Sequence, residues 1–488
     1  MNFSRPARFM TITTAAVSLF MIFPASWGAA IGDGGAAPLF SASAVGMLIS
    51  ALLYSVSRKY SVGDMNAREA ILSVAGSWVL ASVVTGLPYF FSRTAGSFLD
   101  AMFEGVSGFT TTGASVIEDL ASAPRSILLW RSFSQWIGGM GIVVMALAVF
   151  PMSGAGTRLY KAEMTGPFHG RLTPRIQETA VILVKTYLIL TCAQVAMLLW
   201  VGLGVFDALT LSFSTIATGG FSPYRDNVGH FAGTYAKWVT AVFLFLSASN
   251  LMFFYSLVTK KNFGAAGENS EMKFYAFTLI VFGALISSLL YLDGIYGSAR
   301  ESLAEGFFHT VSILSTCGFF TADYCEWPAS VRILTLALMF CGGCSVSTAG
   351  GMTCARVLTV LRHIGAEFRR RLHPRAIIPT RVGDSPADEG VVSACFAYVT
   401  AYTAIFTAAM AIAGLFGLDV AAAFSGAAAA LGNVGPGFGM VVPSAASTAE
   451  TYASLPSAVK IVYMFLMLCG RLEIFTLLVI FTPDFWRK

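Results

Sequence analysis

Four glycine-rich turns recur along the chain at matched intervals. They read TTTGAS at 110–115, ATGGFS at 217–222, STCGFF at 315–320 and GNVGPG at 432–437. Aligned on Gly113, Gly220, Gly318 and Gly435, the turns lie 107, 98 and 117 residues apart. Glycine permits backbone angles that point successive carbonyl groups toward one axis. A ring of carbonyl oxygens replaces the hydration shell of a monovalent cation, so the four turns together indicate a cation site.

Each turn taken alone is also typical of an ordinary surface turn, because Gly, Thr and Ser are common turn residues. The repetition favours a pore, because every turn follows a short semi-polar run and precedes a long apolar one. Non-helical backbone at membrane depth persists only where it lines a polar cavity or is buried in protein. The short runs, if helical, would also aim their negative dipole ends at the same cavity.

The composition is typical of a membrane protein. Of 488 residues, 56% are hydrophobic and 12% are charged, and the mean hydropathy is +0.71. Soluble globular proteins carry about 25% charged residues, so an ordinary soluble enzyme, a disordered chain and a coiled coil are excluded. The net charge of +5 is too mild and too scattered to indicate nucleic-acid binding.

Ten apolar runs are long enough to cross a bilayer, which takes about 20 residues. They lie at 10–31, 39–56, 68–92, 127–150, 177–204, 236–258, 273–293, 331–360, 390–416 and 458–482. Four semi-polar runs, at 97–109, 205–216, 302–314 and 419–431, are too short to cross. The predicted fold is an all-α polytopic membrane protein. Two N-terminal transmembrane helices (1–64) precede four repeats of span, short helix and span (65–157, 158–262, 263–375 and 376–488).

Charge sets the predicted orientation. With both termini in the cytoplasm, 21 of the 31 Lys and Arg residues lie inside, as the positive-inside rule requires. The short runs then lie outside, on a face rich in Asp and Glu that would attract cations, although depletion of basic residues explains part of that bias. The run at 10–31 resembles a signal peptide, but it exceeds the usual apolar core of about 7–15 residues, which favours an uncleaved span.

Two features inside predicted spans could do chemistry. Arg471 lies near the middle of the last span, where a charged side chain costs about 2.5–3.5 kcal/mol on insertion scales. Glu473 is on a different helix face, so Arg471 either pairs with another helix or places a fixed positive charge below the turns. The span at 331–360 is interrupted by small residues, which indicate either a close packing seam or an irregular segment.

The cysteines suggest no metal site. Cys341 and Cys344 have no further Cys or His beside them in the sequence, so they do not form a zinc site. Cys317 and Cys325 both lie outside in the predicted topology, and they either form a disulfide or remain free thiols.

These motifs resemble the Trk/Ktr/HKT superfamily of potassium transporters, most closely its bacterial TrkH-like branch. The resemblance runs from about residue 100 to 480. The motifs that carry it are SGFTTTGA at 107–114, QWIGGMG at 135–141, KAEMTGP at 161–167, GGCS at 342–345, STAGG at 347–351, GNVGPG at 432–437 and GRLE at 470–473.

The resemblance implies a single-chain pore with pseudo-fourfold symmetry that conducts K⁺ through a filter of backbone carbonyls. The implied filter residues are Thr111, Thr112, Gly113, Thr218, Gly219, Gly220, Thr316, Cys317, Gly318, Asn433, Val434 and Gly435. It also implies an intramembrane gate built from Gly342, Gly343, Ser345, Ser347, Thr348, Gly350, Gly351 and Arg471. Glycine at position 113 favours K⁺, since serine there is associated with sodium preference in plant relatives. Many relatives carry Lys after the gate, where this chain has Thr353 and then Arg356.

The resemblance further implies a homodimer in the inner membrane and a cytosolic nucleotide-binding subunit of the TrkA type. The sequence agrees with a separate regulator, because no stretch between spans reaches the roughly 50 residues of a domain. No cofactor is expected. The alternatives are Na⁺ or unselective K⁺/Na⁺ passage, and an integral-membrane enzyme. An enzyme would need clustered acidic or His residues at the membrane face, and the sequence offers none, so the chain is predicted not to be an enzyme.

Overall fold

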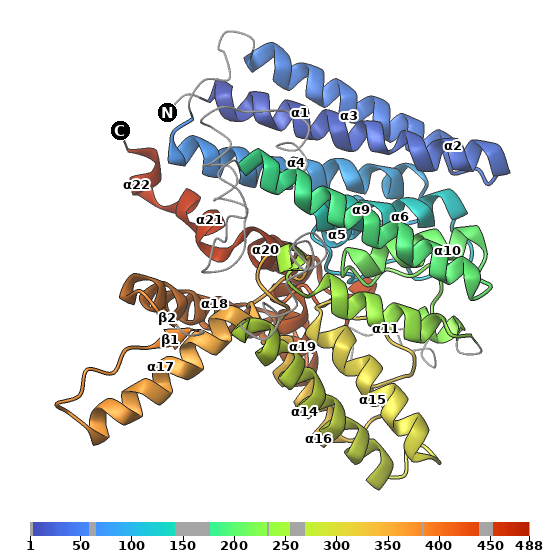
Figure 1. Ribbon diagram of the computed structural model, residues 1–488. Helices are drawn as coiled ribbons and strands as arrows, with labels where there is room; N and C mark the ends of the chain where they lie inside the picture. The colour runs from blue at the N-terminus through green and yellow to red at the C-terminus, as the bar shows by residue number, and fades with distance from the viewer. Residues whose placement is uncertain are drawn as a thin grey trace.

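The described part of the protein is all-helical apart from one small hairpin (Figure 1). The computed structural model describes residues 3–57, 65–141, 176–231, 234–253, 269–382, 385–438 and 452–487. The hairpin pairs β1 (Arg381–Val382) with β2 (Ser385–Pro386). The predicted motif at 161–167 and the connections at 58–64 and 254–268 lie outside the described residues.

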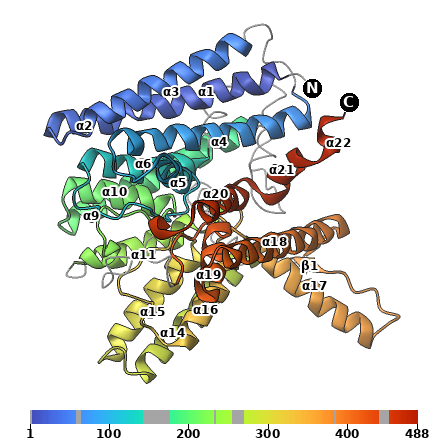
Figure 2. The same cartoon turned by 180° about the vertical axis from the view of Figure 1, so that it is seen from behind.

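Three N-terminal helices form a layer along one side of the molecule, seen in blue in Figures 1 and 2. They are α1 (Ser4–Phe20), α2 (Ile22–Ile31) and α3 (Ala36–Ser57). Small hydroxylated residues let α1 and α3 approach closely: the Ser43 hydroxyl donates to the Ser18 carbonyl at 2.7 Å, and Ser50 donates to Thr11 at 2.9 Å. Arg5 forms an ion pair with Glu69 on α4, so the layer is attached to the first repeat.

Four repeats follow, each with a long first helix, a short helix and a second helix. The first contains α4 (Ala67–Phe91), α5 (Phe98–Phe109) and α6 (Arg125–Met140), and the second α9 (Ile176–Trp200), α10 (Val205–Ile216) and α11 (Ala236–Ser247). The third contains α14 (Ser270–Leu292), α15 (Ala299–Leu314), α16 (Ala329–Met339) and α17 (Cys354–Leu372). The fourth contains α18 (Glu389–Leu415), α19 (Val420–Leu431) and α20 (Ser457–Leu472). This arrangement confirms the predicted fold class.

Three of the four short helices begin where the sequence supplies a side-chain cap, and α10 begins after Gly204 without one. Ser97 accepts the Asp100 N–H at the start of α5, Ser298 accepts the Glu301 N–H at α15, and Asp419 accepts the Ala421 N–H at α19. Such caps satisfy backbone donors that have no partner within the helix. The four helices lie within three residues of the runs predicted at 97–109, 205–216, 302–314 and 419–431.

The second helices of the first, second and fourth repeats correct the sequence prediction. Continuous spans were expected at 127–150, 236–258 and 458–482, but α6, α11 and α20 end after 16, 12 and 16 residues. The interruption expected within 331–360 is present, since α16 ends after 11 residues. Gly141 and Glu473, which follow α6 and α20, have φ of 79° and 70°, and these angles stop a right-handed helix. Within the described residues, six helices are long and apolar enough to cross a membrane, and they correspond to the other six predicted spans.

The last span is sharply bent. Beyond Glu473 the chain continues as α21 (Ile474–Leu478), η4 (Val479–Phe481) and α22 (Pro483–Trp486), and the span is bent by 119° between its two parts. The two termini lie at the same end of the molecule, where the Phe3 and Trp486 rings stack 6.1 Å apart (Figures 1 and 2). The same end carries the basic residues of α17, which Figure 1 shows projecting from the body.

Candidate ion pathway

The four glycine-rich turns share one backbone conformation. The residue two positions before each repeat glycine is left-handed: φ is 55° at Thr111, 51° at Thr218, 58° at Thr316 and 52° at Asn433. The repeat glycines also have positive φ, at 86°, 82°, 75° and 94° for Gly113, Gly220, Gly318 and Gly435. A left-handed non-glycine residue costs roughly 1–2 kcal/mol. The same strain at four matched positions shows that the sequence repeat is a structural repeat.

A hydrogen bond at the end of each short helix produces this conformation. The N–H of Thr112, Gly219, Cys317 or Val434 donates to the carbonyl five residues earlier, at 2.8–3.0 Å. This bond is the 6→1 hydrogen bond of a Schellman motif, in which a residue with left-handed backbone angles ends a helix. Each short helix therefore ends at its turn, and the chain leaves the direction of the helix axis there.

The four turns form a closed ring. A Cβ added to Gly113 would lie 2.3 Å from the carbonyl oxygen of Gly219, and one on Gly220 would lie 2.1 Å from that of Cys317. A Cβ on Gly318 would lie 2.0 Å from the Val434 oxygen, and one on Gly435 would lie 2.3 Å from the Thr112 oxygen. Each repeat glycine thus packs against the carbonyl that precedes the repeat glycine of the next turn, and the fourth turn returns to the first.

Side chains from neighbouring helices hold the ring. Gln135 donates from Nε2 to the Gly219 carbonyl at 2.5 Å and accepts the Phe221 N–H at 3.1 Å, so it clamps both sides of Gly220. The Tyr452 hydroxyl donates to the Gly435 carbonyl at 2.6 Å. Because these donors are buried, the turns cannot relax independently of the helices around them.

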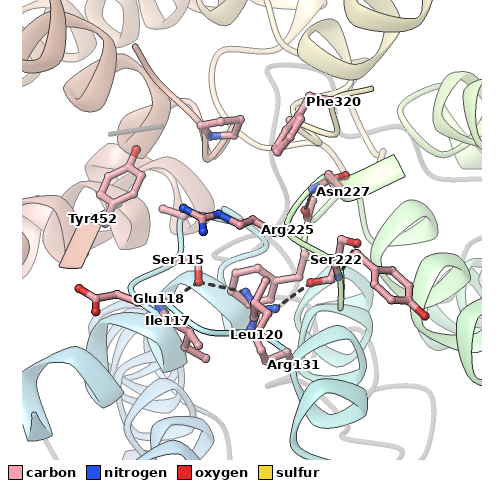
Figure 3. A pocket seen from close by; sticks show the side chains of 17 residues that line it. Ser115, Ile117, Glu118, Leu120, Arg131, Ser222, Arg225, Asn227, Phe320 and Tyr452 are labelled. Atoms are coloured by element: carbon pink, nitrogen blue, oxygen red, sulfur yellow. Dashed lines mark hydrogen bonds between the residues drawn. The ribbon is translucent and has the colours of Figure 1, made fainter. Parts of the chain in front are cut away.

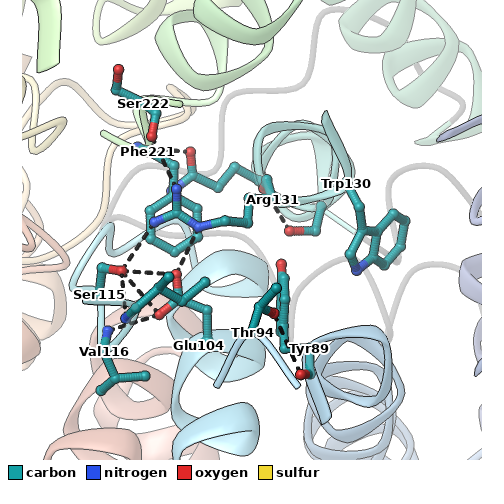
Figure 4. A network of polar contacts seen from close by, with 12 residues as sticks. Tyr89, Thr94, Glu104, Ser115, Val116, Trp130, Arg131, Phe221 and Ser222 are labelled. Carbon is teal, nitrogen blue, oxygen red and sulfur yellow. Dashed lines mark hydrogen bonds and ion pairs between the residues drawn. The ribbon is translucent and has the colours of Figure 1, made fainter. Parts of the chain in front are cut away.

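A buried ion pair between Arg131 and Glu104 packs against the first turn (Figure 4). Arg131 donates from Nε to Glu104 at 2.8 Å, and its terminal nitrogens donate to the Ser222 carbonyl and the Ser115 hydroxyl at 3.0 and 3.1 Å. Glu104 also accepts the Val116 N–H at 2.9 Å. The two side chains are only 0–2% exposed, so their charges are matched inside the protein. The network joins α5, α6 and the first two turns.

Two further ion pairs join one repeat to the next. Lys460 on α20 contacts Asp100 on α5 at 2.6 Å, and Lys237 on α11 contacts Glu305 on α15. Asp100 and Glu305 occupy equivalent places, each 13 residues before its repeat glycine. The acidic outer face predicted from the sequence is therefore only partly a free negative surface, since Glu104, Asp100 and Glu305 are held in pairs.

An irregular segment between α16 and α17, residues 340–353, lies against one side of the ring. The Gly350 N–H donates to the Thr316 hydroxyl at 2.9 Å. A Cβ on Gly350 would lie 2.7 Å from the Asn433 side chain, and one on Gly351 would lie 3.0 Å from the Gly432 carbonyl. The sequence left open whether this stretch is a packing seam within a helix or an irregular segment, and in the structure it is irregular. Most of its predicted residues, including Gly342, Gly343, Ser345, Thr348, Gly350 and Gly351, are buried, and Ser347 is partly exposed.

Arg471 connects the loop to the first repeat. Its guanidinium donates to the Thr348 carbonyl at 2.5 Å and to the Gly138 and Gly139 carbonyls at 3.1 Å each. The side chain is 8% exposed. Glu473 forms an ion pair with Arg356, whose Nη2 contacts both carboxylate oxygens at 2.6 and 2.7 Å. The Arg356 guanidinium also lies over the Tyr398 ring, 3.7 Å from its centre.

On the other side of the ring lies a pocket (Figure 3). Gly113, Gly220, Gly318 and Pro436 line it, and so do Glu118, Arg225, Asn227 and Tyr452. The ring therefore separates this pocket from the loop. The structure brings the predicted filter residues together in the ring, and it places the predicted gate loop and Arg471 beside that ring.

Comparison with known proteins identifies the chain. A sequence profile of the TrkH family, described as cation transport protein, matches residues 37–488. The chain belongs to the TrkH family. The Trk system potassium uptake proteins TrkH of Salmonella typhimurium and of Escherichia coli K12 are each 35% identical to it, over 491 and 494 residues, with 100% of both chains covered. The crystal structure of the potassium transporter TrkH from Vibrio parahaemolyticus matches with a TM-score of 0.86, at 34% identity and 100% coverage of both chains.

Membership of the TrkH family confirms the resemblance that the sequence motifs predicted, and with it the prediction that the chain is a multi-pass membrane transport protein rather than an enzyme. Sequence reasoning missed three supporting residues: Gln135, Arg131 and Tyr452. Gln135 belongs to one of the family motifs, but its hydrogen-bond partner Gly219 is 84 residues away in the chain, so the contact could not be predicted from the sequence. The open question of the outer cysteines is also answered, because Cys317 and Cys325 are both free thiols, and Cys317 lies in the ring.

Proposed function

We propose that this chain takes up K⁺ across the cytoplasmic membrane through the ring of four turns. The observation that carries the proposal is the closed ring of turns, in which each repeat glycine contacts the carbonyl group that precedes the repeat glycine of the next turn. Such a ring can present carbonyl oxygens to one ion, and carbonyls replace the hydration shell of K⁺. The proposed filter comprises the repeat glycines and the two residues before each. The names of the relatives, Trk system potassium uptake proteins, support K⁺ as the ion.

In this proposal the loop at 340–353 is the gate. It lies against the side of the ring opposite the pocket, so an ion that has passed the filter meets the loop next. The Arg471 guanidinium places a positive charge there and holds the loop through Thr348. A positive charge below the filter disfavours a cation at that point, so conduction requires the loop and Arg471 to move together.

The positive-inside rule places both termini in the cytoplasm and the pocket outside. That orientation supports docking of a separate nucleotide-binding subunit of the TrkA type on the basic end near α17. Pairing of two copies is supported by apolar side chains that α17 leaves exposed, among them Leu361, Ile364, Phe368 and Leu372. Apolar patches on a surface commonly mark interaction sites.

The test is uptake by cells without potassium uptake of their own, with and without a TrkA-type partner, followed by flux into liposomes that contain the purified protein. Rescue of growth at low K⁺ and flux selective for K⁺ over Na⁺ are expected. Equal K⁺ and Na⁺ flux would overturn the K⁺ assignment in favour of unselective passage. An absence of cation flux with the partner present would overturn transport through the ring.

A further inference from the structure

The second turn differs from the other three at the position before its repeat glycine. That position is Gly219, whereas the first, third and fourth turns carry Thr112, Cys317 and Val434 there. The φ of Gly219 is not positive, so its backbone angles do not require glycine. The space around it does, because a Cβ on Gly219 would lie 2.4 Å from Cδ of Gln135 and 2.5 Å from its Oε1. The amide of Gln135 therefore fills the place where the other turns have a side chain.

Gln135 belongs to α6 of the first repeat, and it reaches across to the second turn. Its Nε2 donates to the Gly219 carbonyl at 2.5 Å, and its Oε1 accepts the Phe221 N–H at 3.1 Å. The side chain is fully buried. Among the residues that the structure describes, Gly219 supplies the one ring carbonyl that accepts a hydrogen bond from a side chain. The ring is therefore not equivalent in its four quadrants.

The Gly219 carbonyl also forms the contact between the first two turns. Gly113 packs against its oxygen, since a Cβ on Gly113 would lie 2.3 Å from it. A carbonyl oxygen has two lone pairs, so the hydrogen bond from Gln135 leaves one of them for an ion. The bond fixes the direction of the carbonyl and polarises it. One side chain thus controls both the position of this oxygen and the strength with which it binds a cation.

We propose that Gln135 is a positioning residue that gives the filter part of its preference for K⁺ over Na⁺, acting through the Gly219 carbonyl. This inference rests on the proposed K⁺ function. Selectivity in a carbonyl filter depends on the size of the cavity and on the field strength of the carbonyl dipoles. Without Gln135 the Gly219 oxygen can move toward a smaller ion, and its lone pairs are no longer shared with a donor. Both changes favour Na⁺, which is the smaller of the two ions.

The experiment measures ⁸⁶Rb⁺ flux into liposomes that contain the purified protein, and the inhibition of that flux by external K⁺ and by external Na⁺. The half-inhibiting concentration of Na⁺ divided by that of K⁺ gives the selectivity ratio. Gln135→Leu removes the donor, and the ratio is expected to fall by about two- to tenfold, the size of one hydrogen bond's net contribution. Gln194→Leu is the control and should leave the ratio unchanged. Gln194 on α9 is equally buried, and its amide has no hydrogen-bond partner among the described residues.

Gln135→Glu tests the hydrogen bond while keeping the shape of the side chain. Its carboxyl group still accepts the Phe221 N–H, but it donates to the Gly219 carbonyl only while it is protonated. The ratio is measured from about pH 5 to pH 9, a window that covers the titration of exposed and buried Glu side chains. Relative to the unmodified protein at the same pH, the ratio should be unchanged at the acidic end and should fall as the pH rises. A merely structural role of Gln135 would not produce this pH profile.

An unchanged ratio in Gln135→Leu, or a fall of the same size in Gln194→Leu, would overturn the inference. So would a ratio in Gln135→Glu that does not fall as the pH rises, and this variant decides alone if Gln135→Leu does not fold. Equal inhibition by K⁺ and Na⁺ in the unmodified protein, or an absence of cation flux, would instead overturn the proposed function.

Discussion

The guanidinium of Arg471 donates a hydrogen bond to the carbonyl oxygen of Thr348, 123 residues away in the chain. The same guanidinium reaches the Gly138 and Gly139 carbonyls at the end of α6. One side chain of the fourth repeat therefore connects the loop of the third repeat to the first. Backbone carbonyls cannot change their charge, so this connection can be broken only by movement of the arginine or of the loop.

Removing the arginine is expected to loosen the loop. Arg471→Ala should raise uptake in the absence of the nucleotide-binding partner by about tenfold or more, because a hydrogen bond to a charged group contributes roughly 1.5–3 kcal/mol, and about 1.4 kcal/mol corresponds to a factor of ten. The measurement is ⁸⁶Rb⁺ flux into liposomes, with Arg371→Ala as the control, since Arg371 is 79% exposed. Unchanged or lower basal flux in Arg471→Ala would contradict the gating role.

The hydroxyl of Thr316 offers a matched test of the contact between loop and ring. Thr316→Val removes the acceptor of the Gly350 N–H and keeps the side-chain shape. A buried donor left without its partner costs roughly 1–3 kcal/mol, so the loop should open more readily and basal flux should rise. Thr218→Val is the control at the equivalent position, because the Thr218 hydroxyl bonds to its neighbour Ala217. A rise of the same size in both variants would show that the effect comes from the turn and not from the loop.

Gly113→Ser should erode the preference for K⁺ over Na⁺. Its Cβ would lie 2.3 Å from the Gly219 carbonyl oxygen, so that oxygen must move away and the ring must widen or distort. Gly417→Ser is the control, because Gly417 has a similar φ of 91° and nothing within 4 Å of an added Cβ. Both variants share the cost of a side chain at positive φ, roughly 1–2 kcal/mol. Competition between K⁺ and Na⁺ for uptake measures the ratio, and an unchanged ratio in Gly113→Ser would remove Gly113 from the filter.

Glu104→Gln should destabilise the protein strongly. It leaves the Arg131 charge buried without its carboxylate, and breaking such a pair typically costs about 3–5 kcal/mol. Glu367→Gln removes an exposed partner of Arg370 and should cost about 0–1 kcal/mol. Thermal unfolding in detergent compares the two. Similar melting temperatures for both variants would mean that the buried pair contributes little to stability.

The sequence predicted the parts of the fold that depend on local pattern. Cap residues such as Ser97 and glycines such as Gly113 set the limits of the short helices, which is why α5 and its equivalents were located closely. The breaks in α6, α11, α16 and α20 were mostly missed, because apolar composition continues through them and hydropathy does not report helix continuity. At Glu473 the break depends on a backbone angle that no residue type requires.

The site was predictable to a similar extent. The turns repeat in sequence, so a cation site at these turns could be proposed from their spacing, and the family resemblance implied its filter residues. The Glu104–Arg131 pair and the Arg356–Glu473 pair join residues 27 and 117 positions apart, and no periodicity predicts such partners. The positive charge of Arg471 was visible in the sequence, but its carbonyl partners Thr348 and Gly138 were not.

Because all four turns of the ring belong to one polypeptide, each quadrant can be altered without altering the other three. The residues at equivalent positions already differ: Thr112, Gly219, Cys317 and Val434 supply the ring carbonyls with four different side chains. A channel assembled from four identical subunits would receive any substitution four times at once. In this protein a mutation changes one quarter of the ring, so the proposed filter can be adjusted in small steps, both by natural variation and in the laboratory.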